Sequence, residues 1–447
     1  MTERNGSSAE TPLTWSQIFI YGGLAVPLAA LNLPLYVYLP TFYAEQMGLG
    51  LASVGTILLL ARIIDTVTDP VLGEISDRTR GRFGQRRPWL ALSAPLLLIA
   101  SYMLFVPGDT ASAFYLFLWS SLAYLAWTAI LLNYAAWGAE LSGDYHERTR
   151  ITSVREGLVI AGIILAAALP ALSGTEPSSG EALWVVFLVV AIGLPVTLLP
   201  PLIILADTAH VQQRRAGMRE GLKVAWQNRP FKRLVSAYFL NGVANGLPAT
   251  LFLLFVNHVL NASAQSGVLL LIYFGSGVLA IPIWLRISRR FGKDRAWMGS
   301  MLWACLIFVW VPFLGAGDVV LFGIICALSG LSLGADLALP SAMQADVVDL
   351  DRLRSGRRRT GFFFAIWSMA TKLALACAVG LAFPILDWVG FSTEGDNNTN
   401  ELLSLAILYG LVPVLFKGLA TALVWGFEID AQTQRELRDD IRQAERA

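Results

Sequence analysis

The nine residues RFGQRRPWL, from Arg82 to Leu90, recur 208 residues later as RFGKDRAWM, from Arg290 to Met298. A second pair of segments has almost the same spacing. AEL, from Ala139 to Leu141, and ADV, from Ala345 to Val347, each close an apolar run and precede a loop rich in Asp and Arg. Two matches at nearly one offset, each in the same place of its half, indicate a duplicated chain.

The composition indicates a membrane protein. Of the 447 residues, 55% are hydrophobic and 15% are charged, whereas a soluble protein carries roughly 25% charged residues. A helix across the bilayer needs about 20 apolar residues, and twelve runs are long enough. They lie near 17–44, 50–75, 88–106, 113–140, 152–172, 183–206, 232–257, 266–288, 296–314, 319–345, 361–385 and 403–427. We predict an all-α membrane protein with twelve transmembrane helices in two six-helix halves, the layout of the major facilitator fold.

The positive charges predict the orientation of the chain. Of the 33 Lys and Arg residues, 25 lie in or beside the five loops that follow even-numbered spans, and the six loops on the other side contain none. Lys and Arg gather in cytoplasmic loops. Both termini are therefore expected in the cytoplasm and the chain in the plasma (inner) membrane. The expected parts are a half at 1–206 with a polar tail at 1–16, a linker at 207–231, a half at 232–427 and a tail at 428–447.

Other features argue against several kinds of partner and site. The net charge of +1 argues against a nucleic-acid partner. Cys305, Cys326 and Cys377 lie far apart in apolar runs with no histidine nearby, which predicts neither a disulfide framework nor a zinc site. No organic cofactor is expected, and the chain is expected to be a monomer in the lipid bilayer.

The second predicted span contains charges that an apolar helix should exclude. It includes RIIDTVTDPVLGEISD, in which Arg62, Asp65 and Asp69 form one stripe along a helix. At the repeat offset the two acids map to Tyr273 and Gly277, so only one half carries them. A residue needed for the fold alone would be expected in both halves, which favours a binding role.

Two carboxylates one turn apart predict a cation site. Their repulsion requires a cation between them or a proton on one of them. Pro70 leaves the carbonyl of Thr66 without its helical donor, and the hydroxyls of Thr66 and Thr68 add further hard oxygen ligands. We predict a Na⁺ or H⁺ site at Asp65 and Asp69. The alternative is a structural ion pair between Arg62 and Asp65.

Two lysines also fall inside predicted spans. Lys372 lies mid-span in SMATKLALA, with Ser368 and Thr371 as near neighbours. An isolated buried ammonium is costly, so Lys372 is expected to face the central cavity and pair with Asp65 or Asp69 across the halves. Lys417 lies nearer the end of its span and is expected to extend its ammonium to the interface.

Three further acids lie in or at the ends of spans. Asp336 is expected either to bind substrate or to cap or pair within its span. Glu140 and Asp346, at the cytoplasmic ends of spans 4 and 10, are predicted to form gate salt bridges that break and re-form as the halves rock. Nothing around His258 marks it as a proton relay.

Two segments carry a family resemblance. DTVTDPVLG, from Asp65 to Gly73, followed by GRFGQRRP, from Gly81 to Pro88, resembles the signature of the glycoside–pentoside–hexuronide:cation symporters, the family of melibiose permease. The segment from Gln344 to Lys372 resembles the second signature of that family. The twelve-span layout agrees, so the resemblance covers nearly the whole chain.

The resemblance implies roles for particular residues. Asp65 and Asp69 match the two aspartates of the family's sodium site, and Lys372 matches the lysine that borders it. Thr68 and Ser368 match polar positions beside that site.

The resemblance is looser at the sugar site. Asn133 stands where the family has a span-4 aspartate, four residues before Trp137, and Arg155 matches a sugar-contacting arginine. The family's acid in span 1 has no counterpart. The implied substrate residues are thus Asn133, Trp137 and Arg155, beside Asp336.

These observations predict a cation-coupled symporter of a sugar or glycoside. The missing acids would also suit a lysophospholipid-like substrate with fewer hydroxyls. An integral-membrane enzyme is disfavoured, because the sequence has no HExxH motif and no cysteine–histidine cluster. A receptor that does not transport is a further alternative, which only a flux measurement separates.

Overall fold

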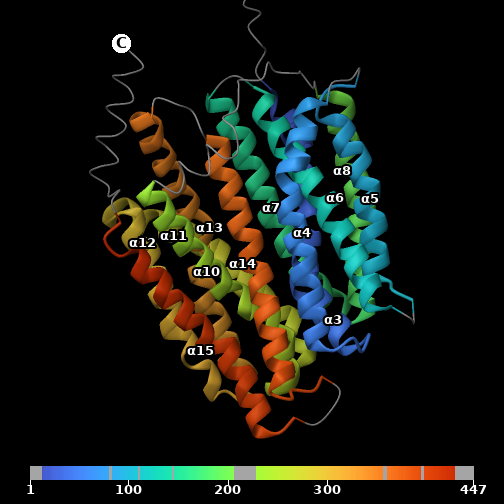
Figure 1. Cartoon of the computed structure of the whole chain (residues 1–447), viewed down its shortest axis with the longest axis vertical. Helices are drawn as coiled ribbons and strands as arrows, with labels where there is room; N and C mark the ends of the chain where they lie inside the picture. The colour runs from blue at the N-terminus through green and yellow to red at the C-terminus, as the bar shows by residue number, and fades with distance from the viewer. Residues whose placement is uncertain are drawn as a thin grey trace, which may run out of the picture.

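The computed structural model describes residues 13–79, 83–108, 111–142, 145–205, 228–355, 360–393 and 397–427. Within these residues, twelve helical segments are long and apolar enough to cross a membrane (Figure 1). The predicted number of spans and the all-α class are confirmed.

The first six spans come from nine elements. The first span is built from α1 (Trp15–Gly23), α2 (Ala25–Leu33), the π-helical turn η1 (Pro34–Tyr38) and α3 (Leu39–Glu45). The others are α4 (Leu51–Arg78), α5 (Arg87–Phe105), α6 (Ala113–Glu140), α7 (Tyr145–Ser173) and α8 (Gly180–Ile204).

The last six spans repeat this arrangement. The seventh span joins α10 (Arg229–Leu254) to a second π-helical turn, η2 (Phe255–Val259). It is followed by η3 (Ser263–Gln265), α11 (Ser266–Phe291), α12 (Lys293–Phe308), η4 (Val311–Phe313), α13 (Val319–Ser355), α14 (Thr360–Trp388) and α15 (Thr399–Val424). The first span of each half thus contains a π turn, a feature frequently found at functional sites.

Two helices extend well beyond the apolar runs that predicted them. α7 begins seven residues before the predicted 152, and α13 ends at Ser355 rather than near 345. The added segments are polar, and hydropathy detects only the part of a helix that faces lipid. The second half begins at Arg229 instead of 232, because the Asn228 side chain caps α10 by accepting from the Phe231 amide. Most of the predicted linker at 207–231, residues 1–12 of the first tail and the whole tail at 428–447 lie outside the described residues.

The two groups of helices lie side by side (Figure 1), and α4 against α14 forms the main contact between them. This contact is close because glycines occupy it. A Cβ on Gly55 would come within 2.9 Å of Phe383, and one on Gly380 within 2.7 Å of Leu59. Small residues let two membrane helices approach, which brings the charged face of α4 next to α14.

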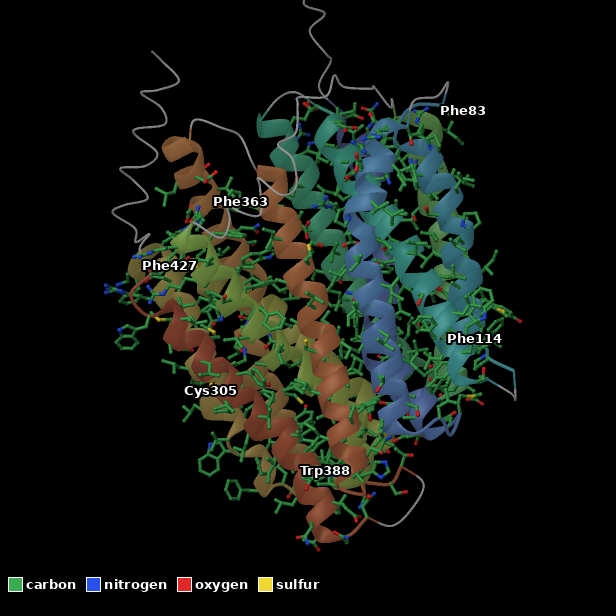
Figure 2. The ribbon with its side chains drawn as sticks, viewed as in Figure 1. Phe83, Phe114, Cys305, Phe363, Trp388 and Phe427 are labelled. Atoms are coloured by element: carbon green, nitrogen blue, oxygen red, sulfur yellow. The ribbon has the colours of Figure 1, made fainter. Side chains whose placement is uncertain are left out.

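Large apolar side chains cover the outside of the bundle (Figure 2). Phe114 is 69% exposed and Trp388 is 86% exposed. Apolar surface on this scale does not occur on a soluble monomer, whereas in a bilayer these side chains face lipid.

Polar contacts join the halves at one end of the bundle. Glu45, at the end of α3 in the first half, lies 3.1 Å from His258 in η2 of the second half. The Ser263 hydroxyl donates to Glu176 at 2.6 Å, again across the halves. Because twelve spans return the chain to the side where it began, this end lies opposite the termini.

Candidate cation and substrate site

Three charged residues lie on one face of α4. Arg62, Asp65 and Asp69 occupy successive turns of this helix, as their spacing predicted. Arg62 Nη1 donates to Asp65 Oδ2 at 2.9 Å, and both side chains are almost fully buried. The structural ion pair that the sequence offered as an alternative is therefore present.

Aromatic rings hold the Arg62 guanidinium. Its Cζ lies 3.5 Å from the centroid of the Tyr124 ring and 4.9 Å from that of Tyr36. Nη2 also donates to the Tyr36 hydroxyl. Cation–π contacts of this kind stabilise a desolvated guanidinium, so Arg62 provides a fixed positive charge beside Asp65.

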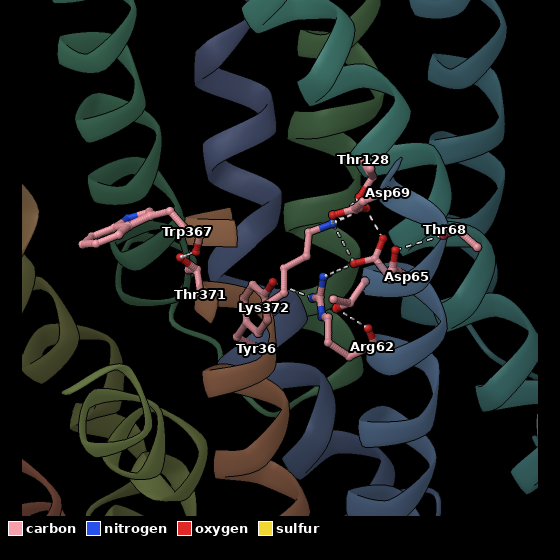
Figure 3. Close-up of polar contacts among 10 residues, drawn as sticks. Tyr36, Arg62, Asp65, Thr68, Asp69, Thr128, Trp367, Thr371 and Lys372 are labelled. Carbon is pink, nitrogen blue, oxygen red and sulfur yellow. Dashed lines mark hydrogen bonds and ion pairs between the residues drawn. The ribbon is translucent and has the colours of Figure 1, made fainter. Parts of the chain in front are cut away.

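Lys372 crosses from α14 to both acids (Figure 3). Its Nζ lies 2.7 Å from each carboxylate oxygen of Asp69 and 3.0 Å from Asp65 Oδ2. The predicted pairing across the halves is confirmed. The ammonium lies between the two carboxylates, where the sequence predicted a coupling cation, so a cation that bound here would have to displace it.

Thr128 in α6 completes this cluster, and the sequence analysis missed it. The buried hydroxyl donates to Asp65 Oδ1 at 2.8 Å and accepts from Lys372 Nζ at 2.7 Å. One signal was available. The repeat offset of 208 maps Thr128 to Asp336, an acid that had already been singled out.

The other predicted ligands lie nearby but are oriented differently. The Thr66 hydroxyl donates to the Arg62 carbonyl at 2.8 Å. The Thr68 hydroxyl donates to the Asp65 carbonyl at 2.9 Å (Figure 3). Both oxygens keep lone pairs, but no contact between either and a carboxylate is found among the described residues. Ser368, one turn before Lys372, is exposed. Its role and those of Thr66 and Thr68 remain predictions.

Thr371 belongs to a separate aromatic contact. Its hydroxyl donates to the Trp367 carbonyl and lies 3.0 Å from the Tyr238 hydroxyl. The Tyr238 and Trp367 rings are stacked, with centroids 3.8 Å apart. Trp367 and Thr371 lie on the side of α14 away from the acids (Figure 3).

Two of the three predicted substrate residues of the first half are packed inside it, and the third, Arg155, is partly exposed. Asn133 accepts from Ser76 Oγ and donates to the Ala129 carbonyl. Trp137 is 1% exposed and meets the edge of the Tyr21 ring. Arg155 pairs with its neighbour Glu156 at 2.7 Å. Neither Asn133 nor Trp137 faces open space in this conformation, so the substrate role of all three remains a prediction.

A second charged cluster lies within the other half. Asp336 Oδ1 accepts from Asn241 Nδ2 at 3.0 Å and from Trp297 Nε1 at 2.7 Å. Its Oδ2 accepts from Asn245 Nδ2 at 2.9 Å and lies 3.4 Å from Lys417 Nζ. Asp336 therefore pairs with residues of α10, α12 and α15 rather than within its own helix.

The expectation for Lys417 was wrong. The residue is 4% exposed, and its Nζ donates to Asn241 Oδ1 at 2.7 Å. Its distance from the end of the span would have allowed the ammonium to reach the interface. The ammonium does not reach the interface because Lys417 lies on the side of α15 that faces α10 and α13.

The two predicted gate acids form ion pairs within single halves. Glu140 pairs with Arg86 at 2.7 Å, and Asp346 pairs with Lys293. In this conformation the described contacts of these acids do not bridge the halves, so the gating role remains a prediction. The polar contacts that do bridge the halves at an end of the bundle include Glu45 with His258, to which the sequence analysis gave no role.

One serine-hydrolase motif was overlooked in the case against an enzyme. Residues Gly330 to Gly334 read GLSLG, which matches the GxSxG pattern of serine hydrolases. That pattern signifies catalysis only on a tight turn between a strand and a helix, whereas here it lies within α13. A Cβ on Gly330 would collide with the Tyr273 carbonyl. The glycines therefore serve the packing of α13 on α11.

Comparison with known proteins places these features in a wider group. A family model described as MFS/sugar transport protein matches residues 18–431. The chain is 23% identical to the sodium-dependent lysophosphatidylcholine symporter 1-A of Danio rerio, over 94% of this chain and 86% of that protein. It is 24% identical to the isoprimeverose transporter of Lactiplantibacillus pentosus, over 95% and 91% of the two chains. The crystal structure of the nucleoside transporter NupG has the same fold, with a TM-score of 0.63, 16% identity, and coverage of 92% and 98%.

Proposed function

The chain belongs to the MFS/sugar transport protein family, and from this membership we propose that it is a secondary transporter that couples Na⁺ or H⁺ movement to uptake of a sugar or glycoside. Relatives described as a sodium-dependent symporter and as an isoprimeverose transporter support cation coupling and a small organic substrate.

One observation carries the proposal, namely the position of Lys372 Nζ between Asp69 and Asp65. Two carboxylates one turn apart need a positive charge between them, and here a lysine of the other half provides it. In the proposed cycle, Na⁺ or H⁺ takes this position, with Thr66, Thr68 and Ser368 near it, and Lys372 withdraws. Na⁺ is the preferred coupling ion, because hard oxygen atoms surround the position.

Displacement of Lys372 would couple the cation to movement of the halves. The ion pair joins α4 to α14, so its loss frees one half to rock against the other around the site. Substrate bound between the halves would then favour the cation-loaded form. By linkage, the cation must raise substrate affinity by the same factor by which substrate raises cation affinity.

The proposed substrate residues of the first half are Asn133, Trp137 and Arg155. Ser76 joins Asn133 to Arg86, since the Ser76 hydroxyl donates to the amide oxygen and accepts from Arg86 Nη1 at 3.1 Å. Arg86 in turn pairs with the proposed gate residue Glu140. A substitution at Asn133 would therefore be expected to affect the Arg86–Glu140 ion pair at the end of α6.

A lysophospholipid-like substrate is the second candidate. The burial of Asn133 and Trp137 and the apolar walls of the cavity among α10, α12 and α13 favour it, as does the lysophosphatidylcholine symporter among the relatives. For either substrate we propose a monomer in the plasma membrane with both termini in the cytoplasm, as the basic loops indicate.

Uptake by purified protein in liposomes tests the cation site. With an imposed Na⁺ gradient at fixed pH, Asp69→Asn should lose cation-stimulated uptake, because a neutral amide neither repels Asp65 nor holds Na⁺. A matched control is Glu74→Gln, which removes an exposed acid of the same helix paired to Arg78. Undiminished stimulation by both Na⁺ and H⁺ gradients in Asp69→Asn would refute the site.

A further inference from the structure

A largely apolar cavity lies inside the second half. It is lined by α10, α11, α12, α13 and α15, with Val37 of η1 as its contact with the first half. Small-molecule sites have mostly apolar walls with a few polar groups. This cavity, which we name the second-half chamber, has walls of that kind.

The chamber has a polar end and an apolar end. Asn245, Ser332 and Lys417 line one part of it, whereas Phe252, Phe308 and Phe322 line another. The aromatic end continues into a cluster in which the Phe322 and Tyr409 rings lie 6.0 Å apart. A ligand that matched these walls would be amphipathic.

The charge balance at the polar end selects a neutral ligand. Lys417 is almost fully buried, and Asp336 with its four donors already balances the ammonium. An anion placed beside Lys417 would bring a second negative charge close to Asp336. Of the three ammonium donors, one bonds to Asn241 and one points to Asp336 at 3.4 Å. The remaining donor suits a neutral acceptor such as a hydroxyl or ether oxygen.

The chamber adjoins the interface between the halves. A second, smaller cavity there is lined by Arg62 of the cation cluster and by Tyr36 and Tyr124, which contact Arg62. Ala249 lines both cavities. Gly246, next to Asn245 of the polar end, also lines the interface cavity. The polar end of the chamber is thus the end that meets the proposed transport path.

We propose that the second-half chamber binds the apolar aglycone of a glycoside, with the sugar oxygens at Lys417 and Asn245. This inference rests on the proposed transport function and narrows its substrate to glycosides that carry an alkyl or aryl group. A free sugar would leave the aromatic end empty.

A series of n-alkyl glycosides tests the chamber in nanodisc-embedded protein. With one sugar head and chains from methyl to octyl, all below micelle-forming concentrations, binding is followed by tryptophan fluorescence or calorimetry. Each methylene that enters the chamber should tighten binding about fourfold until the chamber is full. Affinity that is independent of chain length would overturn the proposal.

Two chamber variants locate the binding. Ala304→Phe places a ring in the chamber and should abolish the dependence on chain length, whereas Leu302→Phe, on the lipid-exposed face of the same helix, should preserve it. Ile325→Ala enlarges the chamber and should move the plateau to longer chains, which keeps the test informative if Ala304→Phe does not fold. Equal chain-length dependence in all three variants would place the aglycone elsewhere and refute the chamber.

Two controls separate this inference from the cation site. Asp69→Asn should lose the effect of Na⁺ on binding but keep the dependence on chain length, so failure of one proposal is visible without failure of the other. Lysophosphatidylcholine with matched chains is the competing ligand. Binding of that lipid together with no binding of any alkyl glycoside would overturn the glycoside assignment.

Discussion

The molecule contains two buried clusters built from similar parts, one between the halves and one within a half. In the first, Asp65 and Asp69 of α4 meet Lys372 of α14. In the second, Asp336 meets Lys417 and two asparagines that all belong to the same half. The two clusters also differ in the number of hydrogen-bond donors around the acid. Asp336 is satisfied by its own half, whereas Asp69 depends on a lysine of the other half.

This difference indicates which cluster can take part in a transport cycle. A charge pair that spans a moving interface can be exchanged for an ion, because the protein supplies only one side of it at a time. A carboxylate held by four groups of one rigid unit has no such alternative. We therefore expect the first cluster to respond to ions and the second to stabilise the fold.

Removal of the acid of the second cluster should have the largest effect on stability. Asp336→Ala would leave the Lys417 ammonium buried without its counter-charge, together with the unpaired indole N–H of Trp297. Breaking a buried pair in this way costs about 3–5 kcal/mol. Thermal unfolding in nanodiscs should show a large loss of stability that Na⁺ does not restore. Recovery of stability on addition of Na⁺ would show that the second cluster also responds to ions, which would contradict the comparison.

Removal of the lysine of the first cluster should destabilise the protein in a way that an ion repairs. Lys372→Met leaves Asp65 and Asp69 facing each other, and Na⁺ can then bind between them without competition. Na⁺ at about 100 times its Kd should return about 2.7 kcal/mol of stability. The measurement is the melting temperature against Na⁺ concentration, with K⁺ as the control ion. A melting temperature that does not respond to Na⁺ would contradict exchange of lysine for ion.

A smaller effect is expected at Thr128, which contacts both the acid and the lysine of the first cluster. Thr128→Val removes hydrogen bonds to Asp65 and Lys372, and a hydrogen bond to a charged group contributes about 1.5–3 kcal/mol. Na⁺ affinity in transport assays should fall about tenfold or more, and Thr128→Ser should restore it. If serine fails to restore it, the shape of the threonine rather than its hydroxyl is what matters.

The smallest effect is expected at the end of the bundle opposite the termini. Glu45→Gln weakens the contact with His258, in which both side chains are partly exposed. Such a pair contributes up to about 1 kcal/mol, so the balance between the two orientations of the halves should shift by up to about fivefold. Distances between spin labels placed on the two halves would report this shift. An unchanged distance distribution would show that the Glu45–His258 pair does not hold the halves together at this end.

Much of this architecture could be predicted from the sequence because hydropathy and repeats are local or periodic signals. The stripe of Arg62, Asp65 and Asp69 follows from helical spacing. The partner of Asp69 was also predictable, since a buried ammonium needs a counter-charge and Lys372 is the mid-span lysine of the second half. Thr128 was not found, because a hydroxyl carries no charge that would mark it in an apolar span.

The sequence by itself determined the twelve spans, the two halves and the acids that lie on one face of α4, because these depend on composition and on the 3.6-residue helical period. Only the tertiary structure decided what those acids meet and which way Lys417 points. Rotation of a helix about its axis is set by its neighbours rather than by its own residues. The close approach that glycines allow between α4 and α14 brings Asp65 and Asp69 to Lys372, whereas the packing of α15 on α10 turns Lys417 towards Asn241 and Asp336.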